Sequence, residues 1–307
     1  MKIGIIGAGA VGSAAAYACV LTRAAHDIVL IDHDPARAHA EAQDVLHATP
    51  FAGGARVRAG SYDDLGGVTA VVIAAGVAQR PGESRLELLG RNEAVFKAII
   101  EPALAAAPDA LLIVATNPVD IMTEVATRLS GLPPSRVIGT GTILDTARFR
   151  ALLARHLQVS PESVHAYVLG EHGDSEVLCW SVATIGTIPI EVYAKAVDRP
   201  LGEEARAAID HAVRHAAQKI ITGKGYTNYG IGGGVSRLVR AIDDDEHLLM
   251  SVSMLTERVE GRGPLALSLP RVVGRAGIVE TVLPDLAPHE HAELGHSADV
   301  LLRAAGR

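Results

Sequence analysis

One histidine of the chain stands among glycines in its second half, within residues 167–175, which read YVLGEHGDS. An imidazole can donate or accept a proton near neutral pH, so His172 is a candidate general acid or base. Asp145 and Arg148 lie three residues apart upstream, and on a helix such side chains face the same way. We expect Asp145 to bind the second imidazole nitrogen and stabilise the imidazolium. We expect Arg148 to bind a substrate carboxylate through two parallel hydrogen bonds.

The first residues of the chain follow the pattern of a dinucleotide-binding turn. A short β-branched run is followed by Gly7, Gly9 and Gly12 in G-x-G-x-x-G spacing, and then by an alanine-rich stretch that predicts a helix. Such glycines permit the turn, let the backbone approach a pyrophosphate and allow close packing of the helix on the strand. Backbone amides at the start of the helix, with Val11 among the candidate contacts, are expected to bind the phosphates.

A carboxylate is placed to complete this site. Asp32 lies 20 residues after Gly12, at the end of the next predicted strand, where it can accept hydrogen bonds from both ribose hydroxyls. Because Asp32 would repel a 2′-phosphate, NAD is favoured over NADP. Asn117 follows another strand, at the sheet edge where ligands of α/β proteins collect, and is a second candidate contact. The alternative is structural, with Asp32 capping the following helix and Asn117 in an ordinary turn before proline.

Strands and helices alternate through the first half of the chain. The predicted strands cover residues 2–6, 28–31, 56–59, 70–75, 111–115 and 137–139, and the predicted helices cover 13–21, 35–47 and 85–107. Apolar strands in this order indicate an α/β fold with a Rossmann-type, doubly wound parallel sheet. The pattern then loosens, with helices predicted at 146–156, 203–222 and 288–305 and strands at 163–169 and 265–273. We therefore expect a dinucleotide-binding domain over residues 1–141 and an α/β substrate-binding domain over 142–307.

Composition narrows the class of protein. The net charge of −7 disfavours nucleic acid as a partner, and the apolar runs are shorter than the roughly 20 residues that a membrane-spanning helix needs. No secretory signal precedes the first strand, so a cytoplasmic location is expected. Cys19 and Cys179 are too few and too far apart for a disulfide framework or a zinc site, and both are expected to be buried. His211 and His215 lack an accompanying glutamate, and no metal site is expected.

These motifs resemble those of the lactate and malate dehydrogenase family, and the resemblance covers the whole chain. Residues 76–85 (GVAQRPGESR) are similar to the mobile substrate loop of the family, 116–120 (TNPVD) to its nicotinamide-side motif, and 170–174 (GEHGD) to its catalytic histidine loop. The resemblance implies that Arg85 closes over the substrate and polarises its carbonyl group. From the pattern alone, Gln79 and Arg85 would equally form a polar surface loop that leads into a helix.

Position 79 separates the two branches of this family. Enzymes of the malate branch carry an arginine there, whereas the neutral Gln79 would leave a second substrate carboxylate buried without a counter-charge. The resemblance therefore implies an NAD-dependent L-2-hydroxyacid oxidoreductase that reversibly reduces pyruvate to L-lactate, the last step of homolactic fermentation. By the same resemblance, Thr227 lies beside the substrate methyl group and Asn117 contacts the substrate. Malate dehydrogenase, or an NAD-sensing module without turnover, are the alternatives.

The resemblance also implies regulation and assembly. Arg150 and His165 occupy positions that bind fructose bisphosphate across a subunit interface in many bacterial members of the family. Two such pairs meeting at a two-fold axis would form a cationic pocket for an activating bisphosphate, and a homotetramer is expected. The alternative is a surface arginine beside a histidine at the end of a strand.

Overall fold

The structure is a computed structural model that describes residues 1–77 and 85–307, apart from the side chains of Arg85, Leu86 and Leu88. In the first half, strands alternate with helices as expected. These elements are β1 (Lys2–Ile6), α1 (Ala10–Thr22), β2 (Asp27–Ile31), α2 (Pro35–Ala48), β3 (Arg56–Ala59), β4 (Ala70–Ile73), α3 (Arg85–Ala106), β5 (Leu111–Val114), α4 (Val119–Ser130) and β6 (Val137–Gly139). Helix α4 is the one long element of this half that the sequence pattern did not predict.

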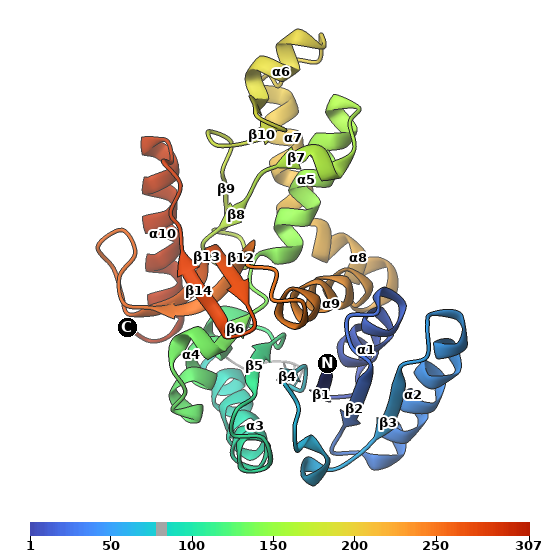
Figure 1. The fold of residues 1–307 in the computed structure, drawn as a ribbon. Coiled ribbons are helices and arrows are strands. Elements are labelled where there is room, and N and C mark those ends of the chain that lie inside the picture. The colour runs from blue at the N-terminus through green and yellow to red at the C-terminus, as the bar shows by residue number, and fades with distance from the viewer. Residues whose placement is uncertain (78–84) are drawn as a thin grey trace.

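The second half combines helices with mostly short strands. Its helices are α5 (Ile143–Leu157), α6 (Ile190–Ala196), α7 (Glu203–Arg214), α8 (Ala216–Lys224), α9 (Tyr229–Asp243) and α10 (Pro288–Ala304). Its strands are β7 (Val164–His165), β8 (Val168–Leu169), β9 (Val177–Leu178), β10 (Thr184–Ile185), β11 (Ile188–Pro189), β12 (Leu248–Thr256), β13 (Leu265–Gly274) and β14 (Gly277–Thr281). Figure 1 shows α5, α6 and α7 extending away from the main sheet, whereas α9 lies beside α1.

Two predicted elements of this half are each divided in the structure. The single helix expected over 203–222 is wrong, because His215, with φ −98° and ψ 6°, leaves the helical conformation between α7 and α8. The buried face of α7 ends at Val213, whereas α8 buries none of its residues, so the two segments do not share one packing surface. The strand expected over 163–169 divides into β7 and β8, which pair in different small sheets.

Among the described residues, nine strands form one sheet in the order β14-β13-β12-β6-β5-β4-β1-β2-β3. Strand β1 lies between β2 and β4, and all pairs from β3 to β6 are parallel, which is the doubly wound order expected from the sequence. The antiparallel strands β12 to β14 extend this sheet beyond β6, where Ser253 pairs with Gly139. The order of the strands reverses between β1 and β4, and ligands of such sheets bind at the carboxyl ends of the strands there.

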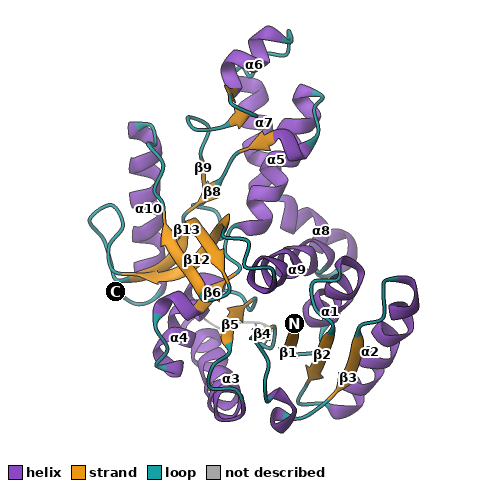
Figure 2. Ribbon diagram, viewed as in Figure 1, coloured by secondary structure: helices purple, strands orange, loops and turns teal. Residues whose placement is uncertain are grey.

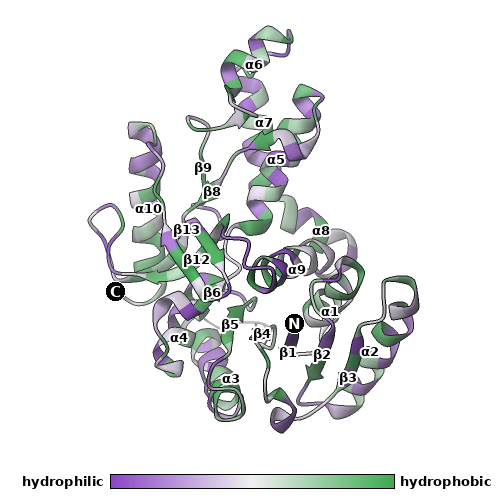
Figure 3. Ribbon diagram, viewed as in Figure 1, coloured by the Kyte–Doolittle hydropathy of each residue, from purple (hydrophilic) through white to green (hydrophobic). Residues whose placement is uncertain are grey.

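Helices cover both faces of the sheet (Figure 2). Ile5 and Leu30 point into a core that contains α1, α2 and α9, whereas Ile31 and Val71 point into a second core with α3 and α4. Successive side chains of a strand point to opposite faces, so strands covered on both sides must be apolar throughout. Figure 3 shows this apolar character along β5. Among the described residues, no helix is both long and apolar enough to cross a bilayer.

The contact between α1 and α9 is unusually close at one glycine. A Cβ atom on Gly232 would lie 2.8 Å from the backbone carbon and oxygen of Ala14, whereas a Cβ atom on the neighbouring Gly233 would have no heavy atom within 4 Å. Because α1 begins at the predicted dinucleotide-binding turn, this contact also holds that turn in place.

We expect Gly232→Ala to lower the free energy of unfolding by about 1–3 kcal/mol, because the two helix backbones must move apart. The matched control is Gly233→Ala, which adds the same methyl group to open space and is expected to raise stability by up to about 1 kcal/mol through helix propensity. Urea unfolding followed by circular dichroism measures both changes. Equal changes for the two variants would contradict the close contact.

Candidate active site

The three glycines of the first turn occupy positions with different steric demands. Gly7 has φ +100°, and a Cβ atom there would lie 2.5 Å from the backbone nitrogen of Ala75. A Cβ atom on Gly12 would lie 1.8 Å from the carbonyl oxygen of Gly7, so this glycine lets α1 approach the turn. A Cβ atom on Gly9, by contrast, would have no heavy atom within 4 Å. The turn is therefore closed on its protein side and open at Gly9, as an approaching pyrophosphate requires.

The amino-terminal end of α1 faces this open side. Gly9 is the N-cap residue, and no side chain caps the helix, so the first-turn amides around Val11 can bind an anion. Asp32 lies at the end of β2, where its Oδ2 accepts a hydrogen bond from the backbone nitrogen of Ala8 at 2.7 Å. The residue that caps α2 is Asp34 rather than Asp32. Asp32 thus braces the glycine turn, and its remaining lone pairs can accept hydrogen bonds from a ribose.

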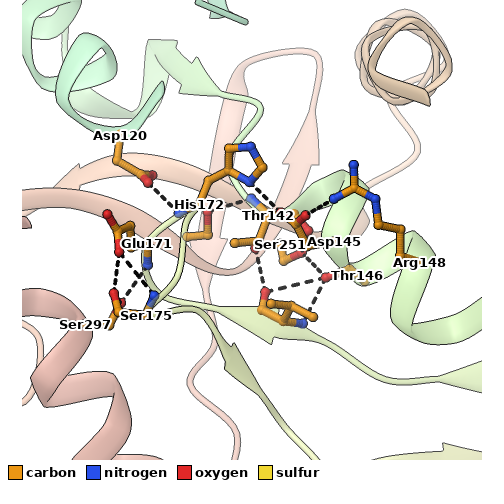
Figure 4. Close-up of polar contacts among 12 residues, drawn as sticks. Asp120, Thr142, Asp145, Thr146, Arg148, Glu171, His172, Ser175, Ser251 and Ser297 are labelled. Atoms are coloured by element: carbon orange, nitrogen blue, oxygen red, sulfur yellow. Dashed lines mark hydrogen bonds and ion pairs between the residues drawn. The ribbon is translucent and has the colours of Figure 1, made fainter. Parts of the chain in front are cut away.

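The catalytic candidates form one connected group at the start of α5 (Figure 4). Nδ1 of His172 lies 2.5 Å from Oδ2 of Asp145, whose side chain is 3% exposed. The other oxygen of Asp145 accepts a hydrogen bond from Nη1 of Arg148, one turn further along the helix. Of the guanidinium nitrogens of Arg148, only Nη1 has a hydrogen-bond partner among the described residues. The other nitrogens can therefore bind a carboxylate. The structure therefore brings together the three side chains that the sequence singled out.

The backbone of the histidine loop is held by side chains from distant elements. The amide of His172 donates to Oδ2 of Asp120 on α4 at 2.7 Å, and the amide of Glu171 donates to Oγ of Ser297 on α10 at 2.8 Å. Gly170 pairs in both directions with the backbone of Ser268 on β13. These contacts come from three elements, so the position of the imidazole depends on the packing of both halves of the chain (Figure 4).

Charges around the imidazole favour its protonated form. Burial alone would lower the pKa of His172, but the hydrogen bond and the charge of Asp145, with the charges of Asp120 and Glu176, raise this pKa to about 9. Burial also raises the pKa of Asp120 to about 6, against the effect of its hydrogen bond to the amide of His172. At neutral pH the imidazole therefore carries a proton that it can donate.

A cavity of about 660 Å³ opens beside this group. His172, Asn117 and Asp120 line it together with His296 of α10, so the loop after β5 and the histidine loop share one space. Thr227 lies half-buried in the loop between α8 and α9 and is not part of the hydrogen-bonded group. A second cavity of about 680 Å³, beside α7 and Trp180, contains none of the candidate site residues.

Other residues singled out from the sequence lie away from this cavity or outside the described residues. Gln79 is outside the described residues, and Arg85 begins α3 with a side chain that is not described. Nε of Arg150 donates to the carbonyl oxygen of Ala166, and its guanidinium stacks 4.9 Å from the ring centre of Tyr167. His165 is exposed on β7, one residue from the carbonyl group that Arg150 binds. Arg150 and His165 therefore lie near each other.

Two buried carboxyl groups near the imidazole were not expected from the sequence. Asp120 stands in the TNPVD motif, but nothing in that motif shows that its carboxylate holds the amide of His172. Glu176 directly follows the histidine motif and is only 4% exposed. Its position just after a loop rich in glycine and polar residues was the available signal, but such residues are usually exposed.

The chain matches two family models. Residues 1–139 match "lactate/malate dehydrogenase, NAD binding domain", and residues 142–305 match "lactate/malate dehydrogenase, alpha/beta C-terminal domain". A protein of Thermus aquaticus described as L-lactate dehydrogenase is 57% identical to this chain, over 99% of this chain and 98% of that protein. A protein of Allorhizobium ampelinum with the same description is 55% identical, over 98% of this chain and 97% of that protein. A crystal structure of a minor L-lactate dehydrogenase from Enterococcus mundtii, 38% identical, superposes with a TM-score of 0.95 over 99% of this chain and 97% of that one.

The doubly wound sheet, the glycine turn and a proton-carrying histidine at the sheet edge define an NAD-dependent oxidoreductase. Hydride transfer between a nicotinamide and a carbonyl carbon requires such a proton-transfer group beside the cofactor. By its sequence and its fold, the chain belongs to the lactate/malate dehydrogenase family.

The glycine turn gives a test that separates cofactor binding from folding. We expect Gly9→Ala to weaken NADH binding by about tenfold or more, because the added methyl group enters the open side of the turn. We expect Gly12→Ala to lower thermal stability as well, because its methyl group meets a backbone oxygen. Fluorescence titration with NADH and thermal unfolding distinguish the two. A Gly9→Ala variant that binds NADH as tightly as the parent would refute the assignment of the turn.

Proposed function

We propose that the protein is an L-lactate dehydrogenase, which reversibly converts pyruvate, NADH and a proton into L-lactate and NAD⁺. The observation that carries this proposal is the sharing of one buried carboxylate, Asp145, between His172 and Arg148. This arrangement joins a proton donor to a carboxylate-binding group, which are the two functions that a 2-oxo acid requires. The relatives named above and the neutral Gln79 support pyruvate as the substrate.

In this reaction each side chain has a separate task. Arg148 binds the substrate carboxylate with the nitrogens that do not bind Asp145, which orients the 2-oxo group. His172 donates the proton from Nε2 to the carbonyl oxygen, because its Nδ1 is held by Asp145. In the reverse direction the neutral imidazole accepts this proton, and Asp145 stabilises the imidazolium that forms. The turn formed by Gly7, Gly9 and Gly12, together with Asp32, would hold the pyrophosphate and a ribose of NADH, and the bound cofactor would supply the hydride.

Three further residues complete the proposed substrate site. By resemblance to the family, Arg85 polarises the substrate carbonyl, and Gln79 accepts the neutral methyl end of pyruvate. Thr227 is assigned to the same methyl end, and Asn117 lines the cavity beside His172. We also propose a cytoplasmic location, where pyruvate and NADH are produced together.

His172 gives the direct test of catalysis. We expect His172→Asn to lower kcat for pyruvate reduction by about 10²–10⁴-fold, because the proton donor is lost, while NADH binding remains within about twofold of the parent. Absorbance of NADH at substrate saturation and a fluorescence titration measure the two effects. A parent protein that binds NADH but oxidises none of it with pyruvate would favour the sensing module instead.

Gln79 gives the test of substrate choice between lactate and malate chemistry. We expect Gln79→Arg to raise the ratio of kcat/KM for oxaloacetate to kcat/KM for pyruvate by about tenfold or more, because the new cation pairs with the second carboxylate. Initial rates with both substrates, side by side, measure this ratio. An unchanged ratio would remove the basis for choosing pyruvate over oxaloacetate from position 79.

We propose further that Arg150 and His165 bind fructose bisphosphate between subunits of a homotetramer. Support comes from their proximity on one surface and from the guanidinium of Arg150, which keeps its Nη groups free of partners among the described residues. Two such pairs at a two-fold axis would place four cationic groups around one bisphosphate.

Pyruvate saturation curves test this regulation. We expect fructose bisphosphate to lower KM for pyruvate in the parent, and Arg150→Gln with His165→Gln to abolish this shift while leaving the curve without the bisphosphate unchanged. Size-exclusion chromatography with light scattering reports the oligomeric state in parallel. Parent curves that coincide with and without the bisphosphate would exclude this activation.

A further inference from the structure

Glu176 is a buried acidic residue next to His172 and Asp145. The proposed mechanism gives Glu176 no role. It follows the histidine loop and directly precedes β9, and it is 4% exposed. Its Oε1 is fully buried and has no hydrogen-bond partner among the described residues. A buried carboxyl oxygen without a partner destabilises the fold, so a structural role alone does not explain a glutamate here.

The carboxyl group lies within the field of the catalytic pair. One carboxyl oxygen of Glu176, one ring nitrogen of His172 and one carboxylate oxygen of Asp145 all lie within 4.8 Å of one another. The cations that face this cluster are Arg148 on α5 and Arg214 on α7. At this separation in a buried site, the charge of one group changes the protonation of the next.

The segment that carries Glu176 is fixed by α7. Nη1 of Arg214 donates to the carbonyl oxygens of Asp174 and Glu176 at 2.8 and 2.6 Å. The same guanidinium is held by both oxygens of Asp210, one turn earlier on α7. This bidentate pair holds the peptide of Glu176 in place, and therefore also its distance from the imidazole.

We propose that Glu176 is a positioning residue of the proton-transfer site, whose charge sets the pH range over which His172 keeps its proton. The proposal deepens the proposed lactate dehydrogenase function and rests on it for its kinetic measurement. Glu176 does not contact the reacting atoms in this scheme. It acts through the imidazole, alongside Asp145 and Asp120, which face His172 from α5 and α4.

The direction of the effect follows from the surroundings of each group. Burial, and next the charge of Asp145, raise the pKa of the Glu176 carboxyl to about 8, against the opposing charges of Arg214, His172 and Arg148. The carboxyl is therefore protonated at neutral pH and ionises as the pH rises. Its negative charge then appears in the range where His172 would otherwise lose its proton, and it favours the imidazolium. Reduction of a 2-oxo acid, which needs that imidazolium, accordingly persists to higher pH.

The variant Glu176→Gln tests this directly, because the amide resembles the neutral carboxyl in shape and cannot ionise. Near about pH 6 we expect kcat/KM for pyruvate to stay within about twofold of the parent, because Glu176 is already neutral there. At higher pH, kcat/KM declines, and we expect the pH midpoint of this decline to be about one pH unit lower in Glu176→Gln than in the parent. Above the midpoint this corresponds to about tenfold lower activity. The matched control, Glu203→Gln, removes an exposed carboxylate on α7 and is expected to leave the profile unchanged.

A uniform loss of activity at every pH, with an unchanged midpoint, would assign Glu176 a structural role and overturn the proposal. A second variant, Glu176→Asp, retains an ionisable group and is expected to restore part of the high-pH activity. Thermal unfolding of each variant identifies any that fail to fold. If Glu176→Gln fails to fold, the pH midpoint of Glu176→Asp is compared with that of the parent.

A spectroscopic titration separates this proposal from the proposed function. The His172 Cε1–H resonance, identified by its absence in His172→Asn, is followed against pH by NMR in the parent and in Glu176→Gln. We expect its midpoint to fall by about one pH unit in the variant, whether or not pyruvate is the substrate. An identical midpoint in the two proteins would refute the role of Glu176. If the parent fails to reduce pyruvate but the midpoint shifts, only the substrate assignment fails.

Discussion

The carboxylate of Asp145 is the group on which the whole site depends. One oxygen holds Nδ1 of His172 and the other holds Arg148, so the proposed proton donor and the proposed substrate anchor are oriented by the same carboxylate. Because this carboxylate is almost completely buried, its charge requires both partners, and losing either would leave it poorly compensated. Catalytic geometry and local stability are thus coupled at a single residue in the first turn of α5.

A network of hydroxyl groups fixes that first turn. Thr142 and Thr146 bind the backbone of Val168, which leads into the histidine loop, and Thr146 also pairs with Ser251 on β12 at 2.7 Å. The amide of Thr142 is bound by Oγ of Ser268 on β13. The antiparallel strands of the second half therefore do more than extend the sheet. Their side chains Ser251 and Ser268 fix the position of α5 relative to the histidine loop. Each of these polar groups is buried and has a partner, which makes the arrangement rigid.

The sequence could predict the elements whose signal is local and missed those that depend on tertiary contacts. The inner parallel strands β4 and β5 are apolar on both faces. The pairing of His172 with Asp145 and Arg148 follows from chemistry and helical spacing. Helix α9 was missed because its glycines lower helix propensity, and Gly232 is accounted for only by its packing against α1. Strand β12 was missed because Ser251 and Ser253 interrupt its apolar run. Asp120 has no local signal for its task, because its partner lies 52 residues away.

The hydrogen bond from the amide of His172 to Asp120 joins the two halves of the chain at the proposed reaction centre. Asp120 lies on α4, which begins where β5 delivers the chain to the cofactor edge of the sheet, whereas His172 belongs to the second half. Their bond fixes the imidazole relative to the carboxyl ends of the parallel strands, where a dinucleotide binds. Hydride and proton must reach adjacent atoms of one substrate, so proton donor and cofactor need a common frame. A buried carboxylate that accepts a backbone amide supplies that frame while leaving the imidazole ring free to exchange its proton.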